Sequence, residues 1–170
     1  MDKIEIKSVE FKSAHHNVDF QPDIDLGGYH IYPFVFLDEA KDWASGALFD
    51  IDPNTHTAVT KVIEPGIQLI EHAIKGSGWF LDIDPNSKLT KHYLDAEKPI
   101  VLQYGTGHAF CFVADSKGLL IQNVTTPPFR PEMEKIIPEN STELPKFFWR
   151  EYNQLISPLP QAASTQPIQK

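Results

Sequence analysis

Cysteine is almost absent from this sequence. Cys111 is the only one among 170 residues. A single cysteine cannot form a disulfide within the chain, and it excludes zinc sites built from several thiolates. Cys111 stands in an apolar run without a cationic neighbour in sequence, so we expect a buried, unreactive thiol rather than a nucleophile.

Long apolar runs and clusters of basic residues are also missing. No segment is long and apolar enough to cross a bilayer, and the charged N-terminus does not predict a signal peptide. The chain has 15 Lys and Arg against 23 Asp and Glu, which argues against a nucleic-acid partner. We therefore expect a soluble, cytoplasmic protein that binds neither membranes nor nucleic acid.

Long helices are not expected over most of the chain, because 14 prolines and nine glycines interrupt it. Short apolar segments between frequent turn signals are typical of an all-β sandwich or barrel, and the length suits one domain. We expect an N-terminal strand or arm over residues 1–22, a β-barrel over 23–138, a C-terminal helical segment over 139–156 and a disordered tail over 157–170.

Two nine-residue segments resemble each other. Residues 46–54 and 78–86 both end in Asp-Ile-Asp-Pro-Asn. Proline fixes φ at the second turn position and asparagine tolerates the third, so each segment predicts a strand that enters a tight turn. Further strands are expected at 68–75 and 108–113, with Gly76-Ser77-Gly78 as a break after the first of these.

Residues 99–113 carry the strongest functional pattern. Two apolar runs flank Tyr-Gly-Thr-Gly-His, so His108 opens a strand. Side chains alternate along a strand, and this places His108, Phe110 and Phe112 on one face. Taken alone, a histidine at the rim of a strand more often forms a hydrogen bond with a neighbouring carbonyl group than takes part in function.

This stretch resembles the second conserved motif of the cupin superfamily, in which a glycine-rich turn delivers a histidine to the mouth of a small β-barrel. Gly105, Gly107 and His108 match that motif, whereas Gln103 stands where the family usually has proline. The resemblance covers about residues 46–134. It implies a jelly-roll β-barrel.

Cupins that bind a transition metal usually take two histidines and a glutamate from a first motif and one histidine from the second. Aligned on the Pro-Gly turn at 65–66, Val62 and Glu64 fall where the first motif has histidines, and Leu69 falls where it has glutamate. Neither Val62 nor Leu69 can bind a metal. Glu71 shares the face of Leu69, His72 lies on the opposite face, and a register slip of one residue would exchange the two.

The resemblance implies a barrel pocket for a small polar organic ligand, either sugar-like or a carboxylate, with no metal and no other cofactor. His108 is the best candidate for a general acid or base, because imidazole titrates near neutrality, and Glu64 or Glu71 could orient it. The expected ligand contacts are Tyr104, Phe110, Phe112 and His72.

Three interpretations remain open at this point. The first is an isomerase- or epimerase-type enzyme that needs no metal. The second is a non-catalytic binding or regulatory module, and the third is a metal-dependent oxygenase or isomerase with non-standard ligands. A distant similarity to the deoxysugar 3,5-epimerase branch lacks the Arg-Gly-Leu-His segment that carries its base, so that activity is not carried over.

The apolar residues near the C-terminus bear on the oligomeric state. Phe147, Phe148 and Trp149 add apolar area to the broad faces that a barrel offers. Such area favours association, and two-fold symmetry is its commonest form. We therefore expect a homodimer.

The purified protein should contain much less than one equivalent of iron, manganese, nickel or zinc. Apolar side chains replace two of the four protein ligands of the usual cupin centre, and the rest cannot readily retain such an ion. Elemental analysis of the purified protein checks this. About one equivalent of metal that is lost in His108→Ala would contradict it and would make Glu64, with Glu71 or His72, a ligand.

Overall fold

The computed structural model describes residues 24–25, 28–36 and 44–157. The expected N-terminal arm and nearly all of the expected C-terminal tail lie outside these residues. In the described part the elements are β1 (Ile24–Asp25), β2 (Tyr29–Phe36), β3 (Ala44–Ile51), β4 (Thr60–Val62), β5 (Gln68–Ile83), β6 (Leu89–Asp95), β7 (Leu102–Gly105), β8 (Ala109–Thr126), the 3₁₀ helix η1 (Pro131–Met133), β9 (Glu134–Ile136) and α1 (Lys146–Ile156). The predicted all-β class with a short C-terminal helix is confirmed.

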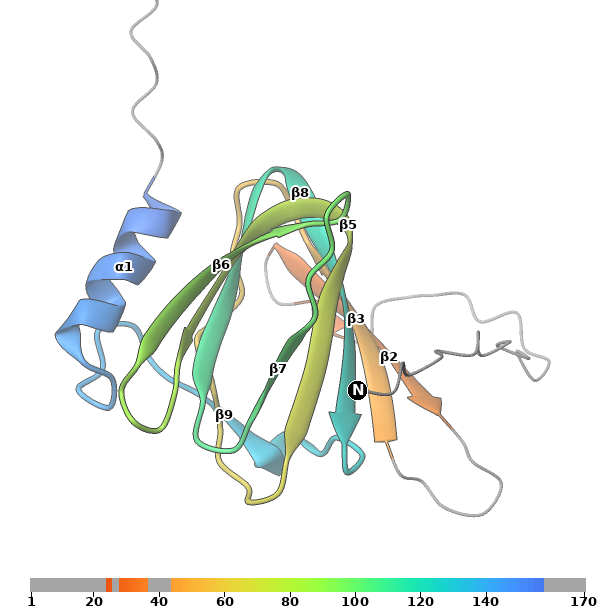
Figure 1. Ribbon diagram of the computed structural model, residues 1–170, viewed down its shortest axis with the longest axis horizontal. Coiled ribbons are helices and arrows are strands. Elements are labelled where there is room, and N and C mark those ends of the chain that lie inside the picture. The colour runs from red at the N-terminus through yellow and green to blue at the C-terminus, as the bar shows by residue number, and fades with distance from the viewer. Residues whose placement is uncertain (1–23, 26–27, 37–43, 158–170) are drawn as a thin grey trace, which may run out of the picture.

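The strands form one antiparallel sheet that curls into a barrel (Figure 1). β5 and β8, with 16 and 18 residues, pair with each other along most of their length. β6 and β7 pair with successive parts of β5, while β3 and β4 pair with opposite parts of β8. The two long strands therefore hold the other strands in place.

β5 crosses Gly76-Ser77-Gly78, where the sequence predicted a break, and that prediction is wrong. The ladder with β8 shifts register here, and such bulges bend a strand without ending it. Glycine is needed because the backbones approach closely: a Cβ on Gly76 would lie 2.0 Å from the carbonyl oxygen of Gly118, and one on Gly78 would lie 2.3 Å from that of Val113.

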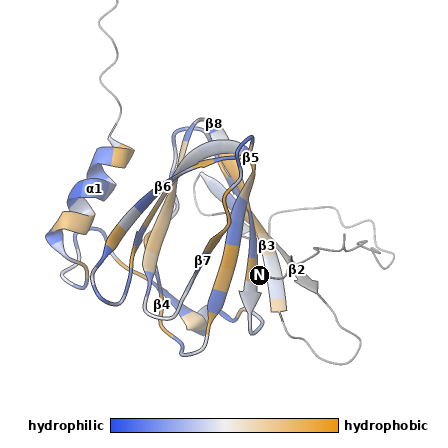
Figure 2. Ribbon diagram, in the orientation of Figure 1, coloured by the Kyte–Doolittle hydropathy of each residue, from blue (hydrophilic) through white to orange (hydrophobic). Residues whose placement is uncertain are grey.

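Apolar residues form two cores on opposite faces of the sheet, and Figure 2 shows the alternation along the strands that produces them. On β8, Phe110 and Phe112 face the barrel interior, whereas Cys111 belongs to the layer between the sheet and α1. α1 buries Phe148 and Tyr152 in that layer. Cys111 is fully buried, and burial raises the pKa of its thiol, as expected for an unreactive cysteine.

Both Asp-Pro-Asn segments form the tight turns that their sequence predicts. The N–H of Thr55 donates to the carbonyl of Asp52 at 3.2 Å, and the N–H of Ser87 donates to that of Asp84 at 2.9 Å. Asn54 has φ of 58°, a left-handed conformation that asparagine tolerates better than most residues.

Three turns gather at the end of the barrel that carries His108 (Figure 1). Thr106, in the β7–β8 turn, donates its hydroxyl hydrogen to the carbonyl of Glu64 in the β4–β5 turn at 2.7 Å. Gly107 lies so close to the β5–β6 turn that a Cβ there would be 2.7 Å from the ring of Pro85. We call the end formed by these three turns the turn end.

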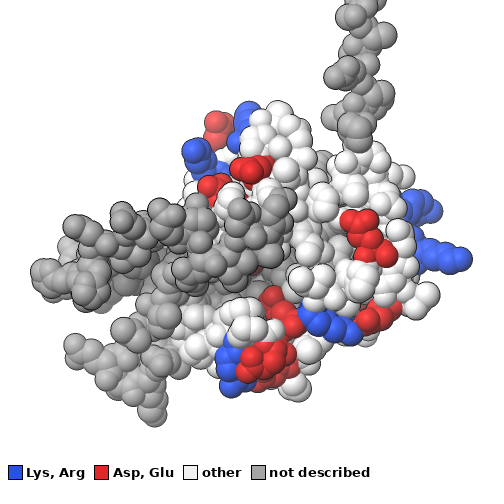
Figure 3. Space-filling model, turned by 180° about the vertical axis from the view of Figure 1, so that it is seen from behind, with Lys and Arg blue, Asp and Glu red and all other residues white. Residues whose placement is uncertain are grey.

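The described surface carries charges of both signs. On the face seen in Figure 3, acidic and basic side chains are interspersed, and the described lysines and arginines form no continuous patch there. In the described residues, no helix is both long and apolar enough to cross a membrane, and α1 has only 11 residues.

Gly76→Ala should lower the free energy of unfolding far more than Gly66→Ala. Both glycines have positive φ, 73° and 83°, which costs another residue about 1–2 kcal/mol. Only at Gly76 would the new Cβ also meet backbone atoms, because nothing lies within 4 Å at Gly66. Urea unfolding should show that Gly76→Ala lowers the free energy of unfolding by at least about 2 kcal/mol more than Gly66→Ala does. Equal losses would mean that the close approach to Gly118 is not maintained in solution.

Candidate functional site

A histidine and an aspartate meet at the turn end. His108 directly precedes β8, and Asp82 stands near the end of β5, opposite Phe110 in the ladder. The Nδ1 of His108 lies 2.9 Å from Oδ1 and 3.1 Å from Oδ2 of Asp82. A carboxylate can only accept, so Nδ1 carries the hydrogen, and Nε2 is the nitrogen that can exchange a proton with a ligand.

The two members of this pair differ in exposure. The side chain of His108 is 23% exposed, whereas that of Asp82 is only 7% exposed and also accepts a hydrogen bond from Thr90 at 3.2 Å. Burial raises the pKa of Asp82, and the hydrogen bond and charge of His108 oppose that effect. The imidazole is therefore accessible, while the buried carboxyl group holds its orientation.

A second carboxyl group lies inside the barrel. Glu71 on β5 is fully buried, opposite Asn123 of β8 in the ladder. Tyr104 of β7 donates its hydroxyl hydrogen to Oε2 of Glu71, and Nδ2 of Asn123 donates to Oε1 at 2.7 Å. Thr125 in turn donates to Oδ1 of Asn123 at 2.9 Å. Both carboxyl oxygens thus have a donor in an otherwise apolar interior.

Burial and hydrogen bonding shift the pKa of Glu71 in opposite directions. Burial raises its pKa to about 7, the hydrogen bonds from Tyr104 and Asn123 work against this rise, and the charge of Glu134 adds to it. Glu134 on β9 also has its pKa raised to about 7 by burial. Near neutral pH, both carboxyl groups can therefore gain or lose a proton.

Tyr104 lies between the buried carboxyl group and the turn end. Its hydroxyl group binds Glu71, and its ring centroid lies 6.0 Å from that of His108. Burial and the charge of Glu71 raise the pKa of Tyr104 well above its usual value, so the hydroxyl group remains a donor. The polar network and the His108–Asp82 pair are thus connected through one aromatic side chain.

Comparisons with known proteins address the fold. No protein-family model and no curated protein matches the sequence. Among solved structures, oxalate decarboxylase from Lactobacillus farciminis in a formate complex superposes with a TM-score of 0.60 and 13% identity, covering 81% of this chain and 39% of that one. CapF from Staphylococcus aureus, a capsular polysaccharide assembling protein, superposes with a TM-score of 0.57 and 11% identity, covering 69% and 31%.

The protein has the cupin fold. Oxalate decarboxylase from Bacillus subtilis also shares it, with a TM-score of 0.58 and 12% identity over 79% of this chain. The chain spans only 31–39% of the length of these three structures. The predicted cupin resemblance is thus confirmed for the fold.

The cupin barrel does not bring all the predicted site residues together. His108, Tyr104 and Glu71 are connected as described above. Glu64 lies in the β4–β5 turn and pairs with Arg130, and His72 lies half-buried on the face of β5 opposite Glu71, as alternation predicts.

The aromatic residues that the sequence predicted as ligand contacts are packed against one another. Phe110 lies 4.7 Å from Tyr104 between ring centroids, and Phe112 lies 5.1 Å from Phe80. All four are at most 6% exposed. Phe110 and Phe112 therefore help to form the barrel core, and at the turn end His108 is the accessible member of the site.

Sequence reasoning missed three site residues. Asp82 belongs to the second Asp-Ile-Asp segment, but nothing in the sequence indicates that it lies beside His108. Asn123 is a polar residue inside an apolar strand, which is a weak signal on its own. Glu134 stands in a short strand after η1, and nothing in its local sequence indicates that it faces the interior.

The donor set does not fit the usual cupin metal centre. Val62 and Leu69, at two of the expected ligand positions, are 0% and 2% exposed and belong to the apolar core. Across the part of the chain that the structure describes, no three His, Cys, Asp or Glu residues lie close enough together to hold a metal ion. The described residues therefore lack the donor set of the usual cupin metal centre.

Glu71→Gln should flatten the dependence of stability on pH. The pKa of Glu71 is about 7 in the folded protein against 4.5 for an ordinary glutamate, so the folded state binds more protons than the unfolded state between those values. The free energy of unfolding therefore falls as pH rises through this window, by up to about 3 kcal/mol for one such group. Glutamine removes that contribution, while Glu134 retains its own.

Urea unfolding between about pH 4 and pH 8 measures this effect. Glu97→Gln is the matched control, because Glu97 is exposed, and its profile should follow that of the unsubstituted protein. Parallel profiles for Glu71→Gln and the control would contradict the prediction.

Proposed function

We propose that the protein binds a small sugar-like ligand at the turn end of the cupin barrel and that His108 exchanges a proton with it. The geometry of the His108–Asp82 pair is the observation that carries this proposal. A general base needs one accessible nitrogen and a partner that fixes its tautomer, and Asp82 supplies that partner at 2.9 Å. The reaction class that suits one acid–base group without a metal is an isomerisation or epimerisation.

The charges around the pair favour a neutral ligand over a carboxylate. Asp84 acts electrostatically on both Asp82 and His108, and Glu134 acts on Glu71. Arg130, a basic residue near the turn end, is already paired with Glu64. A dianion would therefore be repelled, whereas sugar hydroxyl groups can donate to carboxylates.

The names of the structural neighbours refer to both classes of ligand, a carboxylate and a sugar. One neighbour is an oxalate decarboxylase and the other a capsular polysaccharide assembling protein. Identities of 11–13% transfer neither activity to this chain. The acidic surroundings of His108 support the sugar-like class as the one to test first.

A non-catalytic binding module is the second candidate. The packed aromatic cluster below His108 favours it, because Phe110 and Phe112 are buried in the barrel interior and carry no acid–base group. The two candidates differ in one respect: only the enzyme needs Nε2 of His108 to take up and release a proton.

His108→Gln should abolish exchange of carbon-bound ligand hydrogen with solvent deuterium. Neutral aldoses and ketoses are incubated with the protein in heavy water, and proton NMR records the loss of each carbon-bound hydrogen. Removal of a general base slows such steps by about 10²- to 10⁴-fold. Asp82→Asn should slow exchange less, because the imidazole remains.

His72→Gln is the matched control, since it removes a histidine from the outer face of β5. It should exchange at the rate of the unsubstituted protein. Undiminished exchange in His108→Gln would refute the assignment of His108. Binding of oxalate or formate in preference to sugars would refute the ligand class, and sugar binding without any exchange would establish the binding module instead.

A further inference from the structure

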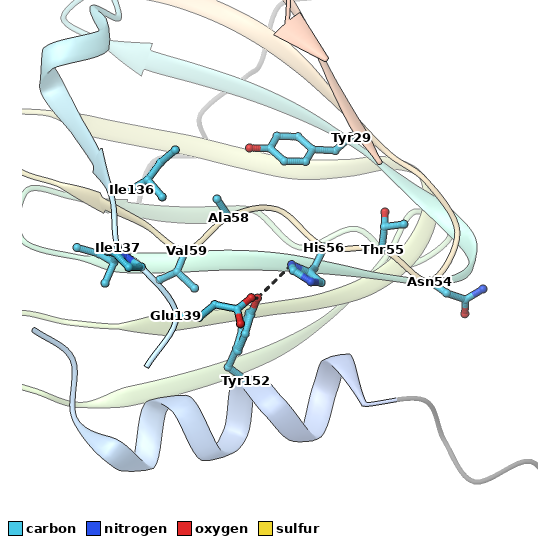
Figure 4. Close-up of a pocket in the computed structure, with 11 residues that line it drawn as sticks. Tyr29, Asn54, Thr55, His56, Ala58, Val59, Ile136, Ile137, Glu139 and Tyr152 are labelled. Carbon is cyan, nitrogen blue, oxygen red and sulfur yellow. Dashed lines mark hydrogen bonds between the residues drawn. The ribbon is translucent and has the colours of Figure 1, made fainter. Parts of the chain in front are cut away.

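A pocket separate from the turn end lies on the α1 side of the barrel (Figure 4). Its volume is about 500 Å³, within the range of small-molecule sites. Its walls are formed by residues 54–56, 58–59 and 136–139 and by Tyr152 of α1. His108, Asp82 and the buried glutamate do not line it, so the proposed function does not account for it.

Three polar side chains meet at one wall of this pocket. Tyr152 donates its hydroxyl hydrogen to Oε1 of Glu139 at 3.1 Å. Burial raises the pKa of Tyr152, and the charge of Glu139 raises it further, so this hydrogen is retained. A hydroxyl group has one hydrogen, so its contact with Nδ1 of His56 at 3.2 Å must be one in which His56 donates (Figure 4).

A second contact fixes the same tautomer of His56. Its Nδ1 also lies 3.1 Å from the carbonyl oxygen of Thr57, which can only accept. Nδ1 therefore carries a hydrogen, and in the neutral ring Nε2 holds the lone pair. No hydrogen bond to Nε2 occurs within the described residues, so this acceptor is available to a ligand.

The available polar atoms at this wall are acceptors. Besides Nε2 of His56, the Oε2 of Glu139 has no partner in the described part of the chain, and none of the residues that line the pocket is a lysine or arginine. The remaining walls are largely apolar and include Val59, Ile136 and Ile137. A carboxylate and a ring nitrogen beside aliphatic walls complement a ligand with a charged donor and an apolar body.

We propose that this pocket binds an organic amine, with its ammonium group on Glu139 and His56 and its apolar body against Val59, Ile136 and Ile137. The ring of Tyr29, which also lines the pocket, adds an aromatic face that suits a cation or a flat ring system. This site is independent of the acid–base site at the turn end.

Tryptamine and indole-3-propionate test the proposal, because they share a ring system and carry opposite charges. Each is titrated into the full-length ¹⁵N-labelled protein, and amide chemical shifts are followed. Tryptamine should move the signals of residues 54–59 and 136–139 in a saturable way, and indole-3-propionate should bind at least about tenfold more weakly, a difference of about 1.4 kcal/mol.

Glu139→Gln should weaken tryptamine binding about tenfold, because glutamine keeps an acceptor for Tyr152 but removes the charge. Glu97→Gln removes one charge elsewhere and should leave the affinity unchanged. Equal affinities for the two ligands, an unchanged affinity in Glu139→Gln, or shifts confined to the turn end would each overturn the proposal.

Discussion

The pairing of β5 with β8 is the constraint on which the rest of the structure depends. Each of these strands carries other strands on its free edge, so the barrel exists only while their ladder is intact. The bulges near Gly76 allow both strands to bend. The bend divides each strand into two segments, one before and one after the bulges, and both segments belong to the barrel. β5 thereby supplies both Glu71 and Asp82, one from each segment.

This arrangement places a polar network inside an apolar core. A buried ionised carboxyl group is costly unless donors compensate for lost water, and Tyr104 and Asn123 are the donors for Glu71. They do not compensate fully, because the pKa of Glu71 still rises to about 7. An apolar residue in its place would avoid this cost, so the ionised form of Glu71 does not itself stabilise the fold.

Part of this structure could be predicted from the sequence because it depends on local rules. Alternation placed Phe110, Phe112 and Cys111 on their correct faces, and the Asp-Pro-Asn turns follow from the conformations of proline and asparagine. The glycine-rich turn before His108 indicated the cupin fold. Each of these signals lies within a few residues of the feature that it predicts.

The remainder depends on register between distant segments. The Asp82 partner of His108 is 26 residues away in sequence, and Asn123 is 52 residues from Glu71. Gly76-Ser77-Gly78 reads as a break because glycine can either end a strand or bend it, and only the approach of Gly118 decides between the two outcomes. Long-range pairing of this kind leaves no local pattern.

The two histidines differ in the groups to which their Nδ1 atoms donate. In both, Nδ1 donates a hydrogen bond and Nε2 is the nitrogen left for a ligand, but the acceptors of Nδ1 differ. Asp82 can compensate the positive charge that appears when Nε2 of His108 takes up a proton, whereas His56 donates to a neutral carbonyl and a neutral hydroxyl group. The first arrangement suits transfer of a proton. The second leaves Nε2 of the neutral ring as a hydrogen-bond acceptor, which is what the proposed amine would require of His56.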